Sequence, residues 1–164
     1  MVIPIFVLLL GLVAPSCWPA PVDLPVVRGF EAPACTWCAG HRGVEYRPSP
    51  GTPIRAVAAG QVVFAGPVAG VMHVTEQLPD GRKVTYAFVR RALVREGDQV
   101  RAGEVVALST DRLLLTVRVG QQYLDPAPLL ARVVGRPRLL PTDGTRPRPG
   151  PMPRFACATR ESGR

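Results

Sequence analysis

Short apolar runs, separated by glycine and proline, follow one another through the middle of the chain. None keeps a helical period over several turns, whereas several alternate apolar and polar positions, which is typical of half-buried strands. The Asp80-Gly81 pair stands between two such runs and predicts a hairpin. We therefore expect a mainly β, antiparallel fold with short turns and at most one short helix, over residues 126–134. The predicted strands cover residues 54–57, 61–65, 71–76, 83–89, 105–108 and 113–119.

The N-terminal part of the chain has a different character. Residues 2–13 form an apolar run that is too short for a helix across a bilayer core of ~30 Å but suits a signal peptide. Small residues at positions 14 and 16 indicate cleavage before Cys17, so we expect a signal peptide over residues 1–16. The protein is then secreted or associated with the cell envelope. A lipid-modified Cys17 is an alternative that the sequence leaves open. Residues 17–40 are predicted to be an extended, proline-broken lead-in.

Positive charge is the main feature of the composition. The formal net charge is +8, and nearly all of the cations are arginine, because Lys83 is the only lysine. Residues 142–164 combine arginine, proline and glycine with few large apolar residues, which predicts a disordered tail. Such a tail makes weak, unselective contact with polyanions and indicates no specific nucleic-acid recognition. Action on polyanions through this tail is one functional alternative.

Cysteine spacing bears on the redox state of the lead-in. Cys35 and Cys38 form a C-x-x-C pair, but no strand–helix–strand pattern surrounds them, which argues against a thioredoxin-like role. A zinc knuckle needs a second Cys/His pair, and the chain has none. In an exported protein a structural disulfide is the expected use, either within the loop or to Cys157.

A histidine and a carboxylate four residues apart follow this pair. The segment reads Gly40-His41-Arg42-Gly43-Val44-Glu45, and on an extended, glycine-entered strand both side chains can face one metal ion. Together with residues 60–66, the Gly-Asp-x-Val-x-x-Gly turn at 97–103 and Tyr-Leu-Asp-Pro at 123–126, it resembles the lysostaphin-like (LytM-type) peptidoglycan zinc metallopeptidases. Degenerate, secreted members of the actinobacterial type are the most similar. The resemblance implies a β domain over residues 41–141, built from a duplicated hybrid motif.

The resemblance also implies positions for the catalytic residues. Active members hold zinc with the His and Asp of H-x-x-x-D and the second His of a later H-x-H. A Y-x-H histidine and the first His of H-x-H act on the water. Here His41 is kept and Glu45 replaces the Asp, but Phe88 stands at the Y-x-H position, and Arg112 and Leu114 stand at the H-x-H positions. None of these three side chains binds zinc or relays protons at neutral pH. We expect a vestigial metal site that binds no cofactor. If the site is functional, the expected cofactor is zinc.

A non-catalytic role follows from this shortage of ligands. The resemblance places Tyr46, Tyr86, Phe88, Arg112 and Arg118 along the former substrate groove, where Trp37 is a further candidate and the arginines could face peptide carboxylates. Core packing is an equal alternative for Tyr86 and Phe88. The predicted partner is peptidoglycan or a cell-wall hydrolase that the domain regulates. The alternatives are an active zinc endopeptidase that cleaves peptidoglycan cross-links and, for His41 and Glu45, a hydrogen bond that merely fixes the loop.

Overall fold

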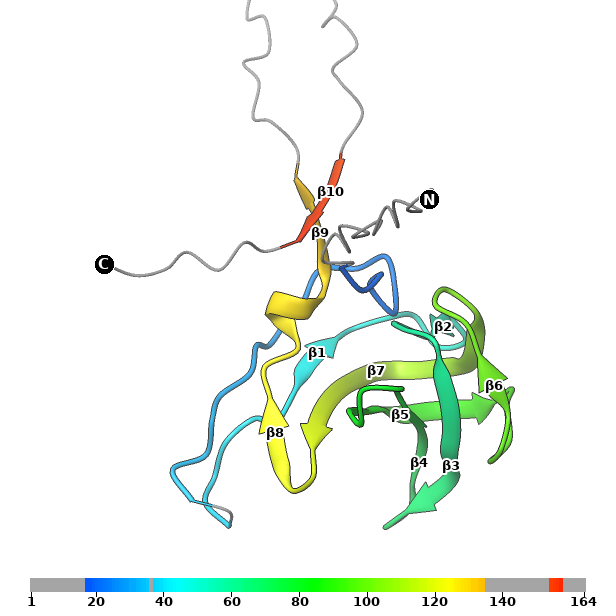
Figure 1. The fold of residues 1–164 in the computed structure, drawn as a ribbon, viewed down its shortest axis with the longest axis horizontal. Coiled ribbons are helices and arrows are strands. Elements are labelled where there is room, and N and C mark those ends of the chain that lie inside the picture. Colours follow the sequence, from blue (N-terminus) through cyan, green and yellow to red (C-terminus); the bar gives the residue numbers. More distant parts are fainter. Residues whose placement is uncertain (1–16, 36, 135–153, 158–164) are drawn as a thin grey trace, which may run out of the picture.

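The strand β7 (Val105–Val119) is the centre of an eight-stranded antiparallel sheet, drawn in Figure 1 as a long curved ribbon. The computed structural model describes residues 17–35, 37–134 and 154–157. The predicted signal peptide lies outside these residues. Six of the strands are neighbours in the order β1-β7-β5-β4-β3-β6. The other two, β2 and β8, also pair with β7. The bounds are β1 (Val44–Tyr46), β2 (Pro53–Arg55), β3 (Gly60–Val68), β4 (Val71–Gln77), β5 (Lys83–Ala92), β6 (Gln99–Val100) and β8 (Gln122–Leu124).

The mainly β, antiparallel prediction is confirmed, and so is the hairpin at Asp80-Gly81, which joins β4 to β5. Gly81 has a φ of +86°, a left-handed conformation that a residue with a side chain adopts only at a cost. Two details of the prediction are wrong. The predicted strands 105–108 and 113–119 are a single 15-residue strand, β7. The predicted helix over 126–134 is only a 3₁₀ turn, η1 (Ala127–Leu129), followed by strand β9 (Ala131–Val134).

Alternation along the strands gives the sheet one face that packs into the core. Leu113, Leu115 and Val117 of β7 are fully buried on this face, and Val84 and Tyr86 of β5 lie beside them. Burial of each such aliphatic side chain contributes roughly 1.5–3 kcal/mol to folding. The residues between them, at positions 114, 116 and 118 of β7, point to the opposite face, where the candidate site lies.

The lead-in is part of the folded domain. Trp18 and Val22 are buried in the same core, and Trp18 pairs with Leu130 before β9. Arg28 and then Glu31 bridge to residues of the β1 segment, so the lead-in runs down one side of the sheet, the left side in Figure 1. It returns to β1 through the loop that carries the C-x-x-C pair.

The predicted disordered tail contains a described element. Strand β10 (Arg154–Cys157) pairs antiparallel with β9 in a two-stranded ribbon at the top of Figure 1. The prediction of disorder is wrong for these residues, and the other residues of 142–164 lie outside the described part of the chain. No helix within the described ranges is long and apolar enough to cross a membrane.

Candidate functional site

His41 and Glu45 lie next to each other at the edge strand β1, and both are buried. The Nδ1–H of His41 donates to the carbonyl oxygen of Gly29 at 2.6 Å, because a carbonyl can only accept. Its Nε2 is turned toward Glu45, 3.7 Å from Oε2, and has no hydrogen-bond partner among the described residues. The lead-in holds this pair in place through backbone hydrogen bonds, since Glu31 pairs with His41 and the Glu45 N–H donates to Arg28.

Two arginines neutralise the Glu45 carboxylate. Nη2 of Arg112 lies 3.0 Å from Oε2, and Nη2 of Arg47 lies 2.9 Å from Oε1. The Glu45 side chain is only 4% exposed, whereas those of Arg112 and Arg47 are 35% and 59% exposed. A buried carboxylate needs a compensating charge, because desolvation disfavours the ionised form. Arg112, the less exposed of the two cations, supplies it from inside the site.

Phe88 and Thr110 fix the position of Arg112. The guanidinium of Arg112 lies over the Phe88 ring, 4.1 Å from its centroid, which is a cation–π contact. Phe88 sits at a bulge in the pairing of β5 with β7 and has a φ of +65°, a strained conformation for a bulky residue. The Thr110 hydroxyl donates to the Phe88 carbonyl oxygen at 2.9 Å and accepts a hydrogen bond from the backbone N–H of Arg112 at 3.2 Å. The bulge therefore aims the aromatic ring at the guanidinium.

These residues do not fit a zinc ion with three protein ligands. Leu114 is the direct partner of Glu45 in the pairing of β1 with β7, so an aliphatic side chain stands beside the carboxylate. Across the ranges that the structure describes, no three histidine, cysteine, aspartate or glutamate side chains come together in a way that could hold a metal. His41 and Glu45 offer one donor group each, and Arg112 adds a fixed positive charge 3.0 Å from the carboxylate. The arrangement is an ion-pair cluster.

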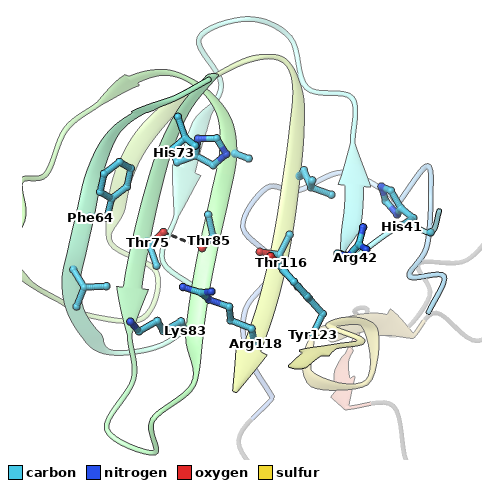
Figure 2. A pocket seen from close by; sticks show the side chains of 15 residues that line it. His41, Arg42, Phe64, His73, Thr75, Lys83, Thr85, Thr116, Arg118 and Tyr123 are labelled. Carbon is cyan, nitrogen blue, oxygen red and sulfur yellow. Dashed lines mark hydrogen bonds between the residues drawn. The ribbon is translucent and has the colours of Figure 1, made fainter. Parts of the chain in front are cut away.

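A groove of about 710 Å³ opens beside this cluster, on the face of the sheet away from the core. Figure 2 shows it crossing strands β4, β5 and β7 from Phe64 and His73 to His41 and Arg42. Its lining contains several cations and no aspartate or glutamate among the described residues. The lining residues are Gly40, His41, Arg42, Val63, Phe64, Val68, His73, Thr75, Lys83, Thr85, Ala87, Leu114, Thr116, Arg118 and Tyr123.

The strand register sorts the floor of the groove into three rungs that cross β5 and β7. The first is apolar and pairs Ala87 with Leu114; the second pairs Thr85 with Thr116; the third pairs Lys83 with Arg118. β4 extends the first two rungs with His73 and Thr75. The hydroxyls of Thr75 and Thr85 are 2.9 Å apart and hydrogen-bonded. The side chains that β5 and β7 contribute to the floor thus change from apolar through hydroxyl to cationic along the groove, with His73 beside the apolar rung.

The structure corrects several predicted groove residues. Tyr46 and Tyr86 are buried in the core, because each shares a strand face with a fully buried valine, and neither lines the groove. Phe88 and Arg112 pack against each other beside Glu45 and do not line it either. Arg118 does line the groove. Trp37 does not, and it is 93% exposed on the lead-in loop.

The cysteines of the lead-in are all oxidised in the structure. A disulfide joins Cys35 to Cys38 within the loop. Cys17 is disulfide-bonded as well. Of the predicted candidates, Cys157 belongs to a strand whose side chains lie outside the described part.

Sequence reasoning missed a buried polar unit under the sheet. Glu76 of β4 is 1% exposed, and burial raises its pKa to about 7. The Tyr86 hydroxyl donates to Glu76 Oε1 at 2.7 Å and accepts the Val57 N–H at 2.8 Å. Burial, followed by the charge of Glu76, raises the pKa of Tyr86 well above its ordinary value. The signal was present in the sequence, since Glu76 falls two residues after Val74 and therefore on the core face of β4.

The comparisons with known proteins agree with this architecture. The model of peptidase family M23 matches residues 39–126, more than half of the chain. An uncharacterized protein of Mycobacterium tuberculosis is 40% identical over 89 residues, which are 54% of this chain and 35% of that protein. The lipoprotein NlpD/LppB homolog of Pseudomonas aeruginosa is 31% identical over 72% of this chain and 46% of its own length. The chain thus spans a third to a half of these relatives.

Solved structures show the same fold. The antimicrobial peptidase lysostaphin from Staphylococcus simulans superposes with a TM-score of 0.61 at 22% identity, over 71% of this chain and 55% of that one. At this level of identity the likeness concerns the fold alone. The family match rests on the sequence, and it spans both β1 with His41 and Glu45 and the whole of β7. The chain therefore belongs to peptidase family M23.

Proposed function

We propose that this chain is a non-catalytic M23 domain of the cell envelope that binds peptidoglycan peptides in its groove. The observation that carries the proposal is the ion pair between Arg112 and Glu45, 3.0 Å apart. A hydrolytic zinc needs three protein ligands and a fourth position for the water that it activates. In this site an arginine side chain neutralises the carboxylate from within the cluster.

The groove supports a binding role. It keeps a volume of about 710 Å³ beside the cluster, and polar side chains of three neighbouring strands face it. Family membership supports peptidoglycan as the ligand, and relatives described as lipoproteins support a cell-envelope location. A cell-wall hydrolase that the domain regulates is the second partner class consistent with this groove.

One observation favours the alternative of an active zinc endopeptidase. His41 Nε2 is buried without a hydrogen-bond partner among the described residues and faces Glu45, as the free nitrogen of a metal ligand does. The two functions differ in their products, so one assay on the wild-type protein separates them.

The test is sedimentation with purified, insoluble peptidoglycan, followed by analysis of the soluble fraction for released muropeptides. We expect the protein to pellet with peptidoglycan and to release nothing, with or without added zinc. Bovine serum albumin is the control for trapping in the pellet. Release of muropeptides that His41→Ala abolishes would establish the endopeptidase, and failure of the wild type to pellet would refute the binding role.

A further inference from the structure

We propose that Lys83 and Arg118 form a carboxylate-binding subsite at one end of the groove. The inference rests on the proposed function and names the group of the peptide that the groove recognises. Lys83 of β5 and Arg118 of β7 are direct partners in the strand register, and both line the groove. Figure 2 shows them together at one end of the floor, with His73 toward the other end.

This cation pair is unfavourable in the free protein. Like charges directly opposite each other on neighbouring strands destabilise a sheet. No aspartate or glutamate lines the groove in the described part of the chain, and the ion pairs found there include neither Lys83 nor Arg118. Some cations of the domain are paired with a carboxylate, as Arg112 is with Glu45 and Arg82 is with Asp80. An anionic ligand would relieve the repulsion that the two side chains leave unbalanced.

A carboxylate on a peptide fits the rest of the floor. The next rung, Thr85 and Thr116, offers hydroxyls that can donate to and accept from a peptide backbone. The rung after that, Ala87 and Leu114, offers an apolar surface for a small side chain. At ~3.3 Å per residue along a strand, the cationic and apolar rungs, four residues apart, are about 13 Å apart. The floor therefore suits a short peptide with a carboxylate at one end and small apolar side chains toward the other.

Fluorescence anisotropy tests the subsite with two probes. One is a synthetic peptidoglycan stem peptide with free carboxylates, and the other is the same peptide with every carboxylate converted to an amide. We expect the free acid to bind at least tenfold more tightly than the amide. Lys83→Met and Arg118→Met should each weaken binding of the free acid roughly tenfold, as expected for loss of a hydrogen bond between charged groups.

Two variants control for net charge. Arg95→Met and Arg101→Met remove the same charge from exposed positions outside the groove and should leave the affinity unchanged. The temperature of thermal unfolding is a second measurement. If Lys83 and Arg118 served only to stabilise the fold, their replacement would lower this temperature. Lys83→Met and Arg118→Met should unfold at the same or a higher temperature than the wild type, because each removes the like-charge repulsion.

Several outcomes overturn the subsite: equal affinity for acid and amide, unchanged affinity of both groove variants, or equal weakening by Arg95→Met. Tighter binding of a glycerol-phosphate polymer than of the free acid overturns it in favour of a phosphate ligand. If the protein pellets with peptidoglycan in these cases, the proposed function stands and only the subsite fails. If it neither pellets nor binds the peptide, both fail.

Discussion

Arg112 reaches across from β7 to Glu45 on β1, and its Nη2 lies 3.0 Å from the carboxylate oxygen that faces His41. The contact joins a strand from the centre of the sheet to an edge strand, 67 residues apart in sequence. It places a permanent cation against a buried anion, with the Phe88 ring behind the guanidinium. Among the described residues, ion pairs and this ring contact hold the site together, and its stability should depend on the arginine.

Removal of Arg112 should destabilise the fold. We expect Arg112→Met to lower the free energy of unfolding by about 2 kcal/mol, since a buried carboxylate loses a charged hydrogen-bond donor. The matched control is Arg47→Met. Arg47 is the other cation that pairs with Glu45, and its side chain is 59% exposed. Its effect should be about 0.5 kcal/mol, as for exposed ion pairs. Urea denaturation measures both values, and equal losses would show that Arg112 has no special part in the cluster.

Gly43 should tolerate no side chain. A Cβ at this position would lie 2.2 Å from the carbonyl oxygen of Leu115 and would push β1 away from β7. We expect Gly43→Ala to cost roughly 3 kcal/mol of stability, the upper part of the range for overpacking. Gly29→Ala is the control, because a Cβ there meets no atom of the described residues within 4 Å. If the two variants unfold at the same temperature, β1 and β7 do not approach each other this closely at Gly43.

Glu76 should make stability depend on pH. Its pKa is about 7 in the folded protein, above the ordinary value of 4.5, so the folded state holds the proton more tightly than the unfolded chain. This contribution is complete below pH ~4.5 and is lost as the pH rises through about 7, and the difference in pKa corresponds to roughly 3 kcal/mol. Glu76→Gln should remove this dependence, whereas Glu96→Gln, at an exposed position, should keep it. Denaturation curves between pH 4.5 and 7.5 measure the slope, and identical slopes for wild type and Glu76→Gln would contradict the assignment.

Tyr86 should be needed for its hydroxyl as well as its ring. Tyr86→Phe removes a donor to Glu76 and an acceptor for the Val57 N–H, and it leaves both of these partners in the core. We expect a loss of about 2–3 kcal/mol, because unsatisfied buried polar groups bear the full cost of desolvation. Tyr123→Phe, on the groove rim, is the control and should change the melting temperature little. If Tyr86→Phe leaves the stability unchanged, the hydroxyl is not needed, and another group such as water satisfies Glu76 and the Val57 N–H.

Local patterns were enough to predict much of the fold. Alternation and turn residues located β3, β4, β5 and the hairpin at Gly81, because these depend on neighbours in sequence. They divided β7 in two, since the polar stretch at Ser109 to Arg112 resembles a turn. In the structure Ser109 is buried, and its hydroxyl donates to the Ser49 carbonyl, so the strand continues through it.

The candidate site was harder to predict, because it depends on register. His41 and Glu45 were found from their spacing, but the pairing of Lys83 with Arg118 requires knowing which residues of β5 and β7 face each other. The resemblance predicts Tyr46 and Tyr86 in the groove, because it gives positions along the chain and not the face of the strand. Burial decides that face, and it places both rings in the core.

Whether the site holds zinc can be measured by calorimetric titration of the wild type beside a variant that carries both Arg112→His and Leu114→His. In the described part of the chain no third metal-binding side chain joins His41 and Glu45, and Arg112 is paired with the carboxylate, so we predict no tight zinc site in the wild type. The double variant removes the competing cation and adds imidazoles at the two positions beside Glu45, so it should bind zinc far more tightly. One tight zinc per wild-type chain, lost in His41→Ala, would mean that the site is a zinc centre.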